Sequence, residues 1–549
     1  MPEHDLESVA LPTLDAAQLA ALERCPLTKL QRYKDGEKLY EAGDRDFRLF
    51  IVKSGALEIV DESGEQPKAV TELKPGQFTG DVTQLTGGPA LVSAVARGDC
   101  EVYEVSPDAL QQLLNNHPDL GDLILRAFIA RRQLLKELGT FKGLIVIGSR
   151  HSPGTFRVRE FLAKNGVLST WLDLEEDPQV QQVLQRFRVS EAESPVVAWG
   201  SKLLLRNPSN RQLAEVLGLR RPVERKVYDL LVVGAGPAGL AAAVYGASEG
   251  LSTVVLERSG PGGQAGRSMR IENYLGFPTG ITGAELAERA WVQARKFGAC
   301  LAVGTQVMRL TFDDGRPLIE IDGGETVSAR CLLIATGAEY RRLDVDGCEQ
   351  FEGCGVYYAA TAIEALMCQG SEVVVVGGGN SAGQAAVFLA GQVRKVYLVI
   401  RGHDLYRDMS YYLARRIEAT PNIEIVLNST FRRMCGDGYL ESVELVNTKT
   451  REVRTLKTPA VFSFIGALPR TDWLPPEIER DAKGFVRSGR ALAQCPHWTA
   501  ERQPYFLETS HPGVFAAGDV RSGSVKRVAS AVGEGSMAVQ FVHACLKEL

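Results

Sequence analysis

The sequence contains no pair of cysteines spaced as CxxC, although it has ten cysteines in 549 residues. The thiols are scattered, as Cys25, Cys100, Cys300 and Cys331 illustrate, and their spacing does not match a metal-ligand pattern. Scattered cysteines are typical of small buried side chains in a reducing compartment. We therefore expect a cytoplasmic protein without a metal site.

The sequence also has no excess of positive charge. Its net charge is −5 and its pI is near 6.0, which argues against a nucleic-acid binder, because phosphate contacts favour a basic surface. Residues 1–15 have no basic run followed by an apolar core, so we expect no signal peptide. The uncharged run 230–248 is about long enough to span a bilayer. It contains Gly234, Gly236, Pro237 and Gly239, however, and therefore predicts a buried strand, a turn and a buried helix instead of a membrane span.

The length predicts three or four domains. Residues 1–118 have short apolar alternations broken by glycine every eight to twelve residues, a pattern that favours a small all-β barrel or jelly roll. Apolar spacing near 3.6 then predicts an amphipathic helix over 119–138. We take 1–140 as the first domain.

Residues 141–220 read as a compact βαβ unit. The patterns predict a strand at 141–149, a helix at 156–166 that stops at Gly166, and strands at 169–175 and 193–200. A closing helix is predicted at 210–219, and the charged segment 219–226 reads as a linker.

The remainder, 227–549, contains an internal repeat. Residues 227–259 and 371–402 each run strand, glycine turn, small-residue helix, strand. Two such units predict two dinucleotide-binding domains, and with the preceding segments they give an α/β multidomain chain.

The first glycine turn follows an apolar strand and opens a helix. In such a turn the first glycine permits the tight bend, the second lets a pyrophosphate approach the backbone, and the third lets helix and strand pack closely. Glu257 stands at the end of the next strand, where an acid holds ribose hydroxyls. The motif suits FAD, or NAD on the motif alone. Its residues are Gly234, Ala235, Gly236, Pro237, Ala238 and Gly239.

The second glycine turn ends differently. Its next strand leads to Arg401, where a guanidinium would bind a 2′-phosphate that a carboxylate would repel. His403 and Arg407 lie nearby in the sequence, and this turn suits NADPH. A surface arginine at a strand end is the alternative for Arg401. The motif residues are Gly377, Gly378, Gly379, Asn380, Ser381 and Ala382.

Further motifs give 227–549 a clear resemblance to low-molecular-weight thioredoxin reductases. They are GGQAG (262–266), IENYLGFP (271–278), ATG (335–337) and GVFAAGD (513–519), which include Gly263, Thr336, Gly337 and Gly518. The resemblance implies an FAD domain of 227–337 and 466–549 with an inserted NADPH domain of 338–465.

The resemblance also implies roles for single residues. Gln264 and Asn273 would approach the flavin and its linker, and Asp519 would bond the ribityl chain. Backbone amides near Arg527 and Val528 would face the pyrimidine edge. A turn residue is the alternative for Asn273 and a helix cap the alternative for Asp519.

The departure from that family concerns its redox dithiol. The stretch that resembles GVSYCATCDG carries Ala359 and Ala362 in place of the cysteines and Ile363 in place of the acid. Thiol–disulfide exchange needs a thiolate, which alanine cannot supply. Cys354 lies upstream and could be reactive, although a packed bystander is favoured. In lacking a dithiol the chain also resembles thioredoxin-reductase-like ferredoxin reductases.

The middle domain resembles glutaredoxin or thioredoxin, again without cysteines. Its loop 151–155 reads HSPGT where that family has CxxC, and the resemblance implies a cis bond between Ser194 and Pro195. His151 could be functional, but a solvated loop histidine is favoured.

The first domain resembles cyclic-nucleotide-binding domains. In its cassette, residues 80–94, Asp81 replaces the family's glutamate and Val92 its arginine. Without that cation the negative charge of a buried cyclic phosphate would be uncompensated. We therefore expect the first domain to be a docking or dimerisation module that does not bind a cyclic nucleotide. The helix 119–138 could form a contact in a homodimer or could pack on its own domain.

The prediction is an NADPH-dependent FAD oxidoreductase with an unidentified acceptor, such as a quinone, a metal protein, oxygen or a partner disulfide. The sequence points to no catalytic side chain. The alternatives are a flavin/NADPH redox sensor that signals through its N-terminal domains and an authentic thioredoxin reductase. With no dithiol to shuttle, we expect the nicotinamide to stack on the flavin in the resting state.

Overall fold

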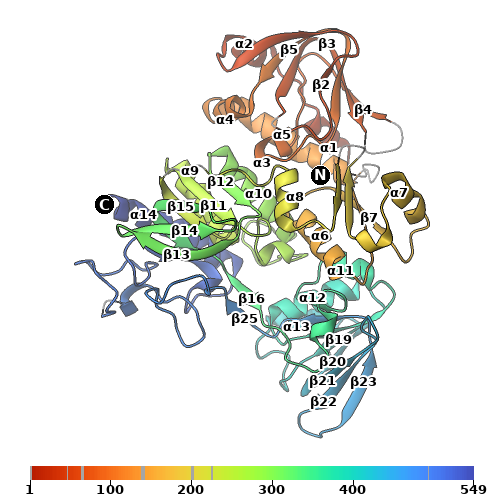
Figure 1. Ribbon diagram of the computed structural model, residues 1–549, viewed down its shortest axis with the longest axis vertical. Coiled ribbons are helices and arrows are strands. Elements are labelled where there is room, and N and C mark those ends of the chain that lie inside the picture. The colour runs from red at the N-terminus through yellow and green to blue at the C-terminus, as the bar shows by residue number, and fades with distance from the viewer. Residues whose placement is uncertain are drawn as a thin grey trace.

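The computed structural model describes residues 3–45, 47–62, 67–137, 143–199, 203–223, 227–492 and 494–548. The chain forms four units (Figure 1). An antiparallel unit, red to orange, lies at one end of the long axis, and a unit coloured cyan to blue lies at the other. The remaining two lie between them. Within the described residues, no helix combines the length and the apolar character needed to cross a membrane.

The first unit is an antiparallel sheet in the order β1-β5-β3-β4, with β2 paired to β5. Helix α5 (Pro118–Glu137) matches the predicted helix 119–138 except for residue 138, which lies outside the described residues. Its Ile124 and Phe128 are fully buried in the core of this unit, so α5 packs on its own domain. The other elements are α1 (Glu3–Ala10), α2 (Ala16–Arg24), β1 (Thr28–Tyr33), β2 (Lys38–Tyr40), β3 (Leu49–Asp61), β4 (Lys68–Leu73), α3 (Thr83–Thr86), β5 (Ser93–Val105) and α4 (Pro107–Asn116).

The second unit is a mixed sheet in the order β7-β6-β8-β9, with β7 parallel and β8 antiparallel to β6. Its first helix begins at Pro153, earlier than predicted, because Ser152 caps it by accepting from the Thr155 amide. The Ser194–Pro195 bond is cis, as the resemblance implied. The sequence analysis missed α7 and β9. The elements are β6 (Leu144–Gly148), α6 (Pro153–Lys164), β7 (Ser169–Asp173), α7 (Val180–Phe187), β8 (Val196–Trp199), β9 (Leu203–Arg206) and α8 (Asn210–Val216).

The third unit has a sheet in the order β12-β11-β10-β15-β14-β13, and β26 joins it beside β15. The chain therefore leaves this sheet after β15 and returns at β26. The run 230–248 forms the end of β10, the glycine turn and α9, as predicted. The elements are β10 (Val227–Val233), α9 (Pro237–Ser248), β11 (Thr253–Glu257), α10 (Gly283–Lys296), β12 (Cys300–Val303), β13 (Val307–Asp313), β14 (Arg316–Ile321), β15 (Thr326–Ile334), β26 (Val514–Ala516) and α14 (Val528–Leu546).

The fourth unit lies between those two passes of the chain. It has a parallel sheet in the order β17-β24-β18-β19-β20, a meander β21-β22-β23, and a two-stranded ribbon of β16 and β25 that joins it to the third unit. The elements are β16 (Ala338–Tyr340), β17 (Val356–Tyr357), α11 (Ala362–Met367), β18 (Glu372–Val376), α12 (Asn380–Ala390), β19 (Lys395–Val399), α13 (Tyr411–Glu418), β20 (Ile423–Val426), β21 (Ser429–Cys435), β22 (Ser442–Asn447), β23 (Val453–Lys457), β24 (Val461–Ser463) and β25 (Ala467–Pro469).

One hydrophobic core joins the second and third units. Phe161 and Leu213 of the second unit belong to the same buried cluster as Leu230 and Trp291 of the third. Burial on this scale is the main stabilising force between packed elements. The second unit is therefore fixed to the third and is not a tethered module, as their side-by-side position in Figure 1 shows.

Candidate active site

A cavity of about 770 Å³ lies between the third and fourth units. The N-termini of α9, α12 and α14 open into it at Pro237, Asn380 and Val528. In the described part of the chain, no side chain caps these three helices. Their first amides are therefore available to an anion, which the helix dipoles also favour.

The first glycine turn is as tight as its motif requires. Gly234 has φ +104°, and a Cβ there would lie 2.4 Å from the Ala335 carbonyl oxygen. A Cβ on Gly239 would lie 1.9 Å from the Gly234 oxygen, so only glycine lets α9 pack this closely on β10. Gly236 faces Gly263 across the cavity wall, where a Cβ on Gly263 would come within 3.0 Å of the Gly236 Cα.

Glu257 ends β11 at the cavity. Its carboxylate accepts from the amides of Ala235 and Ser259, each at 2.8 Å, and from Gly260 at 3.2 Å. Thr305 lines the same end of the cavity, and its buried hydroxyl has no hydrogen-bond partner among the described residues. A fixed carboxylate beside an unsatisfied hydroxyl suits a ribose or base that offers hydroxyl and amino groups.

Gln264 and Asp519 also line the cavity. The Gln264 side-chain amide donates to the Ala338 carbonyl, which fixes its orientation. Burial raises the pKa of the Asp519 carboxyl, and nearby Lys526 opposes that rise. Lys526 also donates to the Asp519 carbonyl oxygen at 2.6 Å. A desolvated carboxyl of this kind gains from a hydrogen bond that a ligand hydroxyl donates.

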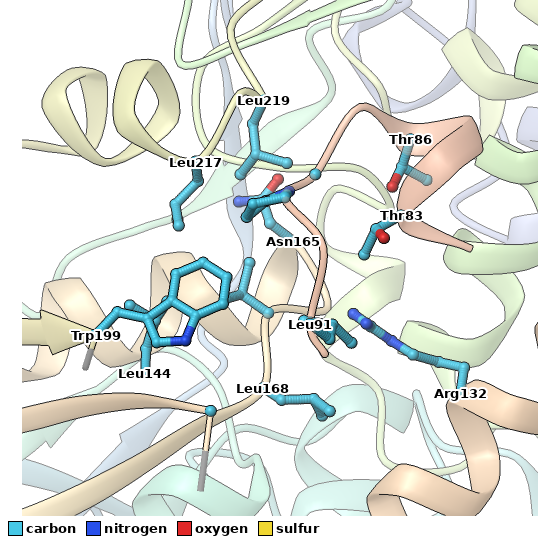
Figure 2. Close-up of a pocket in the computed structure, with 14 residues that line it drawn as sticks. Thr83, Thr86, Leu91, Arg132, Leu144, Asn165, Leu168, Trp199, Leu217 and Leu219 are labelled. Carbon is cyan, nitrogen blue, oxygen red and sulfur yellow. The ribbon is translucent and has the colours of Figure 1, made fainter. Parts of the chain in front are cut away.

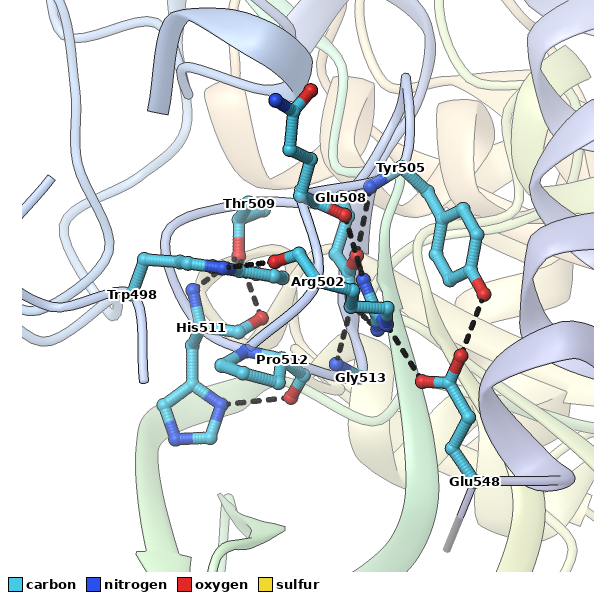
Figure 3. A network of polar contacts seen from close by, with 10 residues as sticks. Trp498, Arg502, Tyr505, Glu508, Thr509, His511, Pro512, Gly513 and Glu548 are labelled. Atoms are coloured by element: carbon cyan, nitrogen blue, oxygen red, sulfur yellow. Dashed lines mark hydrogen bonds and ion pairs between the residues drawn. The ribbon is translucent and has the colours of Figure 1, made fainter. Parts of the chain in front are cut away.

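A network of polar contacts holds the strand that leads to Asp519 (Figure 3). Glu508 is fully buried and accepts a two-pronged contact from Arg502 at 2.6 and 2.8 Å. It also accepts from the amide of Gly513 at 3.0 Å, immediately before β26. Arg502 reaches Glu548 at 2.6 Å, beyond the end of α14. The network therefore ties β26 to the C-terminal end of the chain.

The structure places most of the predicted cofactor residues around this one cavity. The residues that line it are Gly234, Gly236, Pro237, Ala238, Glu257, Gly263, Gln264, Asn273, Thr336, Gly337, Asn380, Ser381, Gly518, Asp519, Arg527 and Val528. Those that lie outside its lining are Gly239, Gly377, Gly379, Ala382, Arg401 and Arg407. Their assignment to FAD or NADPH stays a prediction.

The second glycine turn packs in the same way as the first. A Cβ on Gly377 would lie 2.6 Å from the Phe464 carbonyl oxygen. Asn380 accepts from the Ser410 amide at 2.7 Å and so holds the loop that follows β19 against α12. Arg401 and Arg407 are exposed on that loop. A dinucleotide on this turn would therefore extend along the loop toward two cations.

The two positions that hold the redox cysteines in the resembling family carry alanines in this chain. Ala359 lines the cavity, and Ala362 begins α11. Cys354 is buried, its thiol donates to the Gln350 carbonyl at 3.5 Å, and burial raises its pKa. A thiol with a raised pKa stays protonated at neutral pH, which supports the bystander interpretation.

The sequence analysis missed three cavity residues on α6 of the second unit. Phe156, Glu160 and Lys164 line the cavity at i, i+4 and i+8, and Arg267 of the third unit joins them. Their helical spacing is visible in the sequence, but nothing in it says which neighbour that face meets.

The cassette of the first unit, residues 80–94, is used for contacts between units. Asp81 accepts from the Thr83 amide at 2.9 Å and lies 3.5 Å from Arg132. Arg132 is buried, donates to the Gly166 carbonyl of the second unit, and lies 3.7 Å from Glu288 of the third.

Little space is left at this junction. The pocket there measures about 30 Å³, room for about one water. Figure 2 shows Thr83 and Thr86 of the cassette on one side of it and Leu144 and Trp199 of the second unit on the other.

Comparison with known proteins identifies the third and fourth units. The sequence model described as "Pyridine nucleotide-disulphide oxidoreductase" matches residues 228–535, more than half of the chain. The chain belongs to this family. A second model, "Cyclic nucleotide-binding domain", matches residues 30–117 of the oxidoreductase, as the resemblance of the first unit predicted.

Similar proteins cover the same part of this oxidoreductase. Thioredoxin reductase of Bacillus subtilis is 36% identical over 327 residues, which are 59% of this chain and 97% of that protein. The "34.2 kDa protein in rubredoxin operon" of Clostridium pasteurianum is 33% identical over 57% of this chain and 96% of that protein.

Solved structures show the same fold. Thioredoxin reductase of T. acidophilum is 31% identical over 58% of this chain and 99% of that one, with a TM-score of 0.53. The Lactococcus lactis enzyme in its FR conformation also has a TM-score of 0.53, at 28% identity over 59% and 100% of the two chains.

Members of the thioredoxin reductase family use FAD and NADPH, and the residues around the cavity fit both. Uncapped helix N-termini match the diphosphates, Glu257 and Thr305 match the ribose and base end, and the buried Asp519 matches a hydroxylated linker.

Proposed function

We propose that this oxidoreductase takes reducing equivalents from NADPH and delivers them to an external acceptor without a dithiol of its own. The observation that carries this proposal is Ala359, which lines the cavity at the position where the resembling family has a cysteine. The nearby Cys354 is buried and stays protonated. Neither residue supplies a thiolate for exchange.

In this proposal the chain's own residues bind FAD and NADPH and orient them toward each other. Bound FAD would accept a hydride from NADPH and release electrons to the acceptor. The first free N–H of α9, at Ala238 next to Pro237, and the amide of Val528 would hold anionic and polar edges, and Glu257 would fix a ribose. Arg401 would select a 2′-phosphate at the second glycine turn. These assignments, the cytoplasmic location and the domain limits 1–140, 141–220, 227–337 with 466–549, and 338–465 are part of the proposal.

The test is a screen of donors and acceptors on the purified yellow protein. Under anaerobic conditions NADPH should bleach the flavin quickly, and NADH should do so more slowly. Steady turnover is then expected with a quinone, a metal protein, oxygen or a partner disulfide. A colourless protein that cannot be loaded with flavin would contradict the proposal.

Authentic thioredoxin reduction is tested separately. Thioredoxin and a thiol reagent are added, and NADPH consumption is compared with that of a dithiol-containing reductase. A comparable rate would overturn the interpretation of Ala359 and Ala362.

A redox sensor is the second candidate function, and Arg132 favours it. This side chain joins the first unit to the second and third, so a change at the flavin could reach the N-terminal surface. Fast bleaching without steady turnover on any acceptor would favour the sensor. The homodimer stays a prediction, which light scattering on the purified protein would test.

The expectation that the nicotinamide stacks on the flavin at rest also belongs to the proposal. Helix α6 supports it because α6 contacts both nucleotide-binding units. The Phe156 ring lies 5.5 Å from the Tyr357 ring in the fourth unit, and Asn165, which caps α6, donates to the Ser259 carbonyl of the third at 2.8 Å. Reduction by NADPH should therefore occur in one fast phase, and a slow main phase would count against it.

A further inference from the structure

Helix α6 runs along the cavity that takes FAD. It has 12 residues, about 18 Å in length, and it begins and ends on different units. At its start Pro153 lies against Gly353, where an added Cβ would be 3.4 Å from the proline. At its end Lys164 packs against the turn after Glu257, where a Cβ on Gly260 would lie 2.9 Å from the Lys164 Cβ. The family match begins at residue 228, so α6 is an addition to the matched part.

Lys164 and Glu160 of α6 form a charged cluster with Arg267 of the third unit, and this cluster has two cations for one carboxylate. Lys164 lies 3.3 Å from Glu160, and Arg267 of the third unit pairs with the same Glu160 oxygen. Burial and Arg267 lower the pKa of the Lys164 ammonium, whereas Glu160 and Glu257 oppose this. Only 18% of the Lys164 side chain is exposed, so water screens this excess charge poorly.

We propose that Lys164 and Arg267 together bind the anionic ribose-diphosphate part of FAD. Helix α6 of the second unit then forms part of the FAD site, together with the third and fourth units. Two cations share one carboxylate in the cavity, and a diphosphate supplies the anion that balances them. Glu160 pairs with both side chains and partly neutralises them. The inference rests on FAD as the cofactor, and it assigns to the middle domain a part in holding it.

A structural ion pair is the competing explanation, and two variants separate the explanations. Lys164→Met and Glu160→Gln break the same pair. A pair with a purely structural role would give the same change in FAD affinity for both. In our proposal Lys164→Met weakens FAD binding, because a cation is lost. Glu160→Gln leaves FAD binding as tight or tighter, because a competing anion is lost.

The measurement is a titration of apoprotein with FAD, followed by quenching of FAD fluorescence. We expect Lys164→Met to raise the Kd about tenfold, the size of one charge-assisted contact, and Lys164→Arg to restore most of the affinity. Arg157→Met is the matched control on the same helix, because Arg157 donates within the second unit, to the Pro208 carbonyl at 2.7 Å. Its Kd should equal that of the wild type.

An unchanged Kd in Lys164→Met, or equal weakening in Lys164→Met and Glu160→Gln, overturns the proposal. If Lys164→Met does not fold, Glu160→Gln still decides, because weaker FAD binding by that variant is contrary to the proposal. A wild-type protein that binds no FAD would instead contradict the cofactor itself, so the two failures are distinguishable.

Discussion

At the scale of single residues, the buried ion pair of Arg502 and Glu508 is expected to contribute strongly to stability. Glu508 is fully buried, so removing its partner leaves an uncompensated charge. We expect Arg502→Met to lower the free energy of unfolding by roughly 3 kcal/mol, measured by chemical denaturation. Arg394→Met is the control, because the Arg394 side chain in the pair with Glu372 is 70% exposed and should contribute less than about 1 kcal/mol. Equal losses in both would contradict this account.

His511 makes the folding stability of the protein depend on pH. Its ring lies 3.7 Å from the Phe312 ring, centroid to centroid, and burial lowers its pKa below the usual 6.5. The unfolded chain therefore binds this proton more readily than the folded one. Its contribution to stability is complete above pH 6.5 and is lost as the pH falls from there toward the lowered pKa. Melting temperatures across this range should depend less on pH in His511→Gln, and an unchanged slope would refute the assignment.

At the scale of elements, the proposed function makes Arg401, just after β19, the residue that selects NADPH over NADH. Arg401 is exposed on the loop that follows β19, and the proposal assigns to it the 2′-phosphate of NADPH. We expect Arg401→Ala to raise the KM for NADPH about tenfold or more, the size of a charge-assisted contact, with little change for NADH. Arg394, at the other end of this strand, pairs with Glu372, and Arg394→Ala should leave both constants unchanged. A parallel loss for NADH would show that Arg401 supports the loop instead.

At the scale of the whole molecule, Arg132 joins three units. Arg132→Met would leave Asp81 and Glu288 without this cation, which we expect to weaken the junction by about 3 kcal/mol. Limited proteolysis should then release the first unit sooner. Arg126→Met is the control on the same helix, because Arg126 pairs with Asp122 in solvent, where both side chains are more than half exposed. Similar cleavage of both variants would show that the junction does not depend on Arg132.

The glycine turns, Glu257 and the β-rich first domain could be predicted from the sequence because each depends on local geometry. Gly234 and Gly239 are required by contacts within one strand–turn–helix unit, and the alternation of apolar residues marks a strand wherever it lies. The start of α6 was wrong by one turn because the cap at Ser152 was overlooked. The amphipathic pattern of α7 and the short β9 were not recognised.

The sequence by itself determined the two glycine turns, the alanines at the positions where the resembling family has cysteines, and the family, since these depend on residue types at fixed spacing. Only the tertiary structure decided that Lys164 and Glu160 line the cavity between the third and fourth units and that the cassette around Asp81 packs between units. The physical reason is that the local sequence of a helix face or a polar loop does not specify which distant segment will pack against it. Packing of distant segments selects that neighbour by the surface it buries and the charges it pairs.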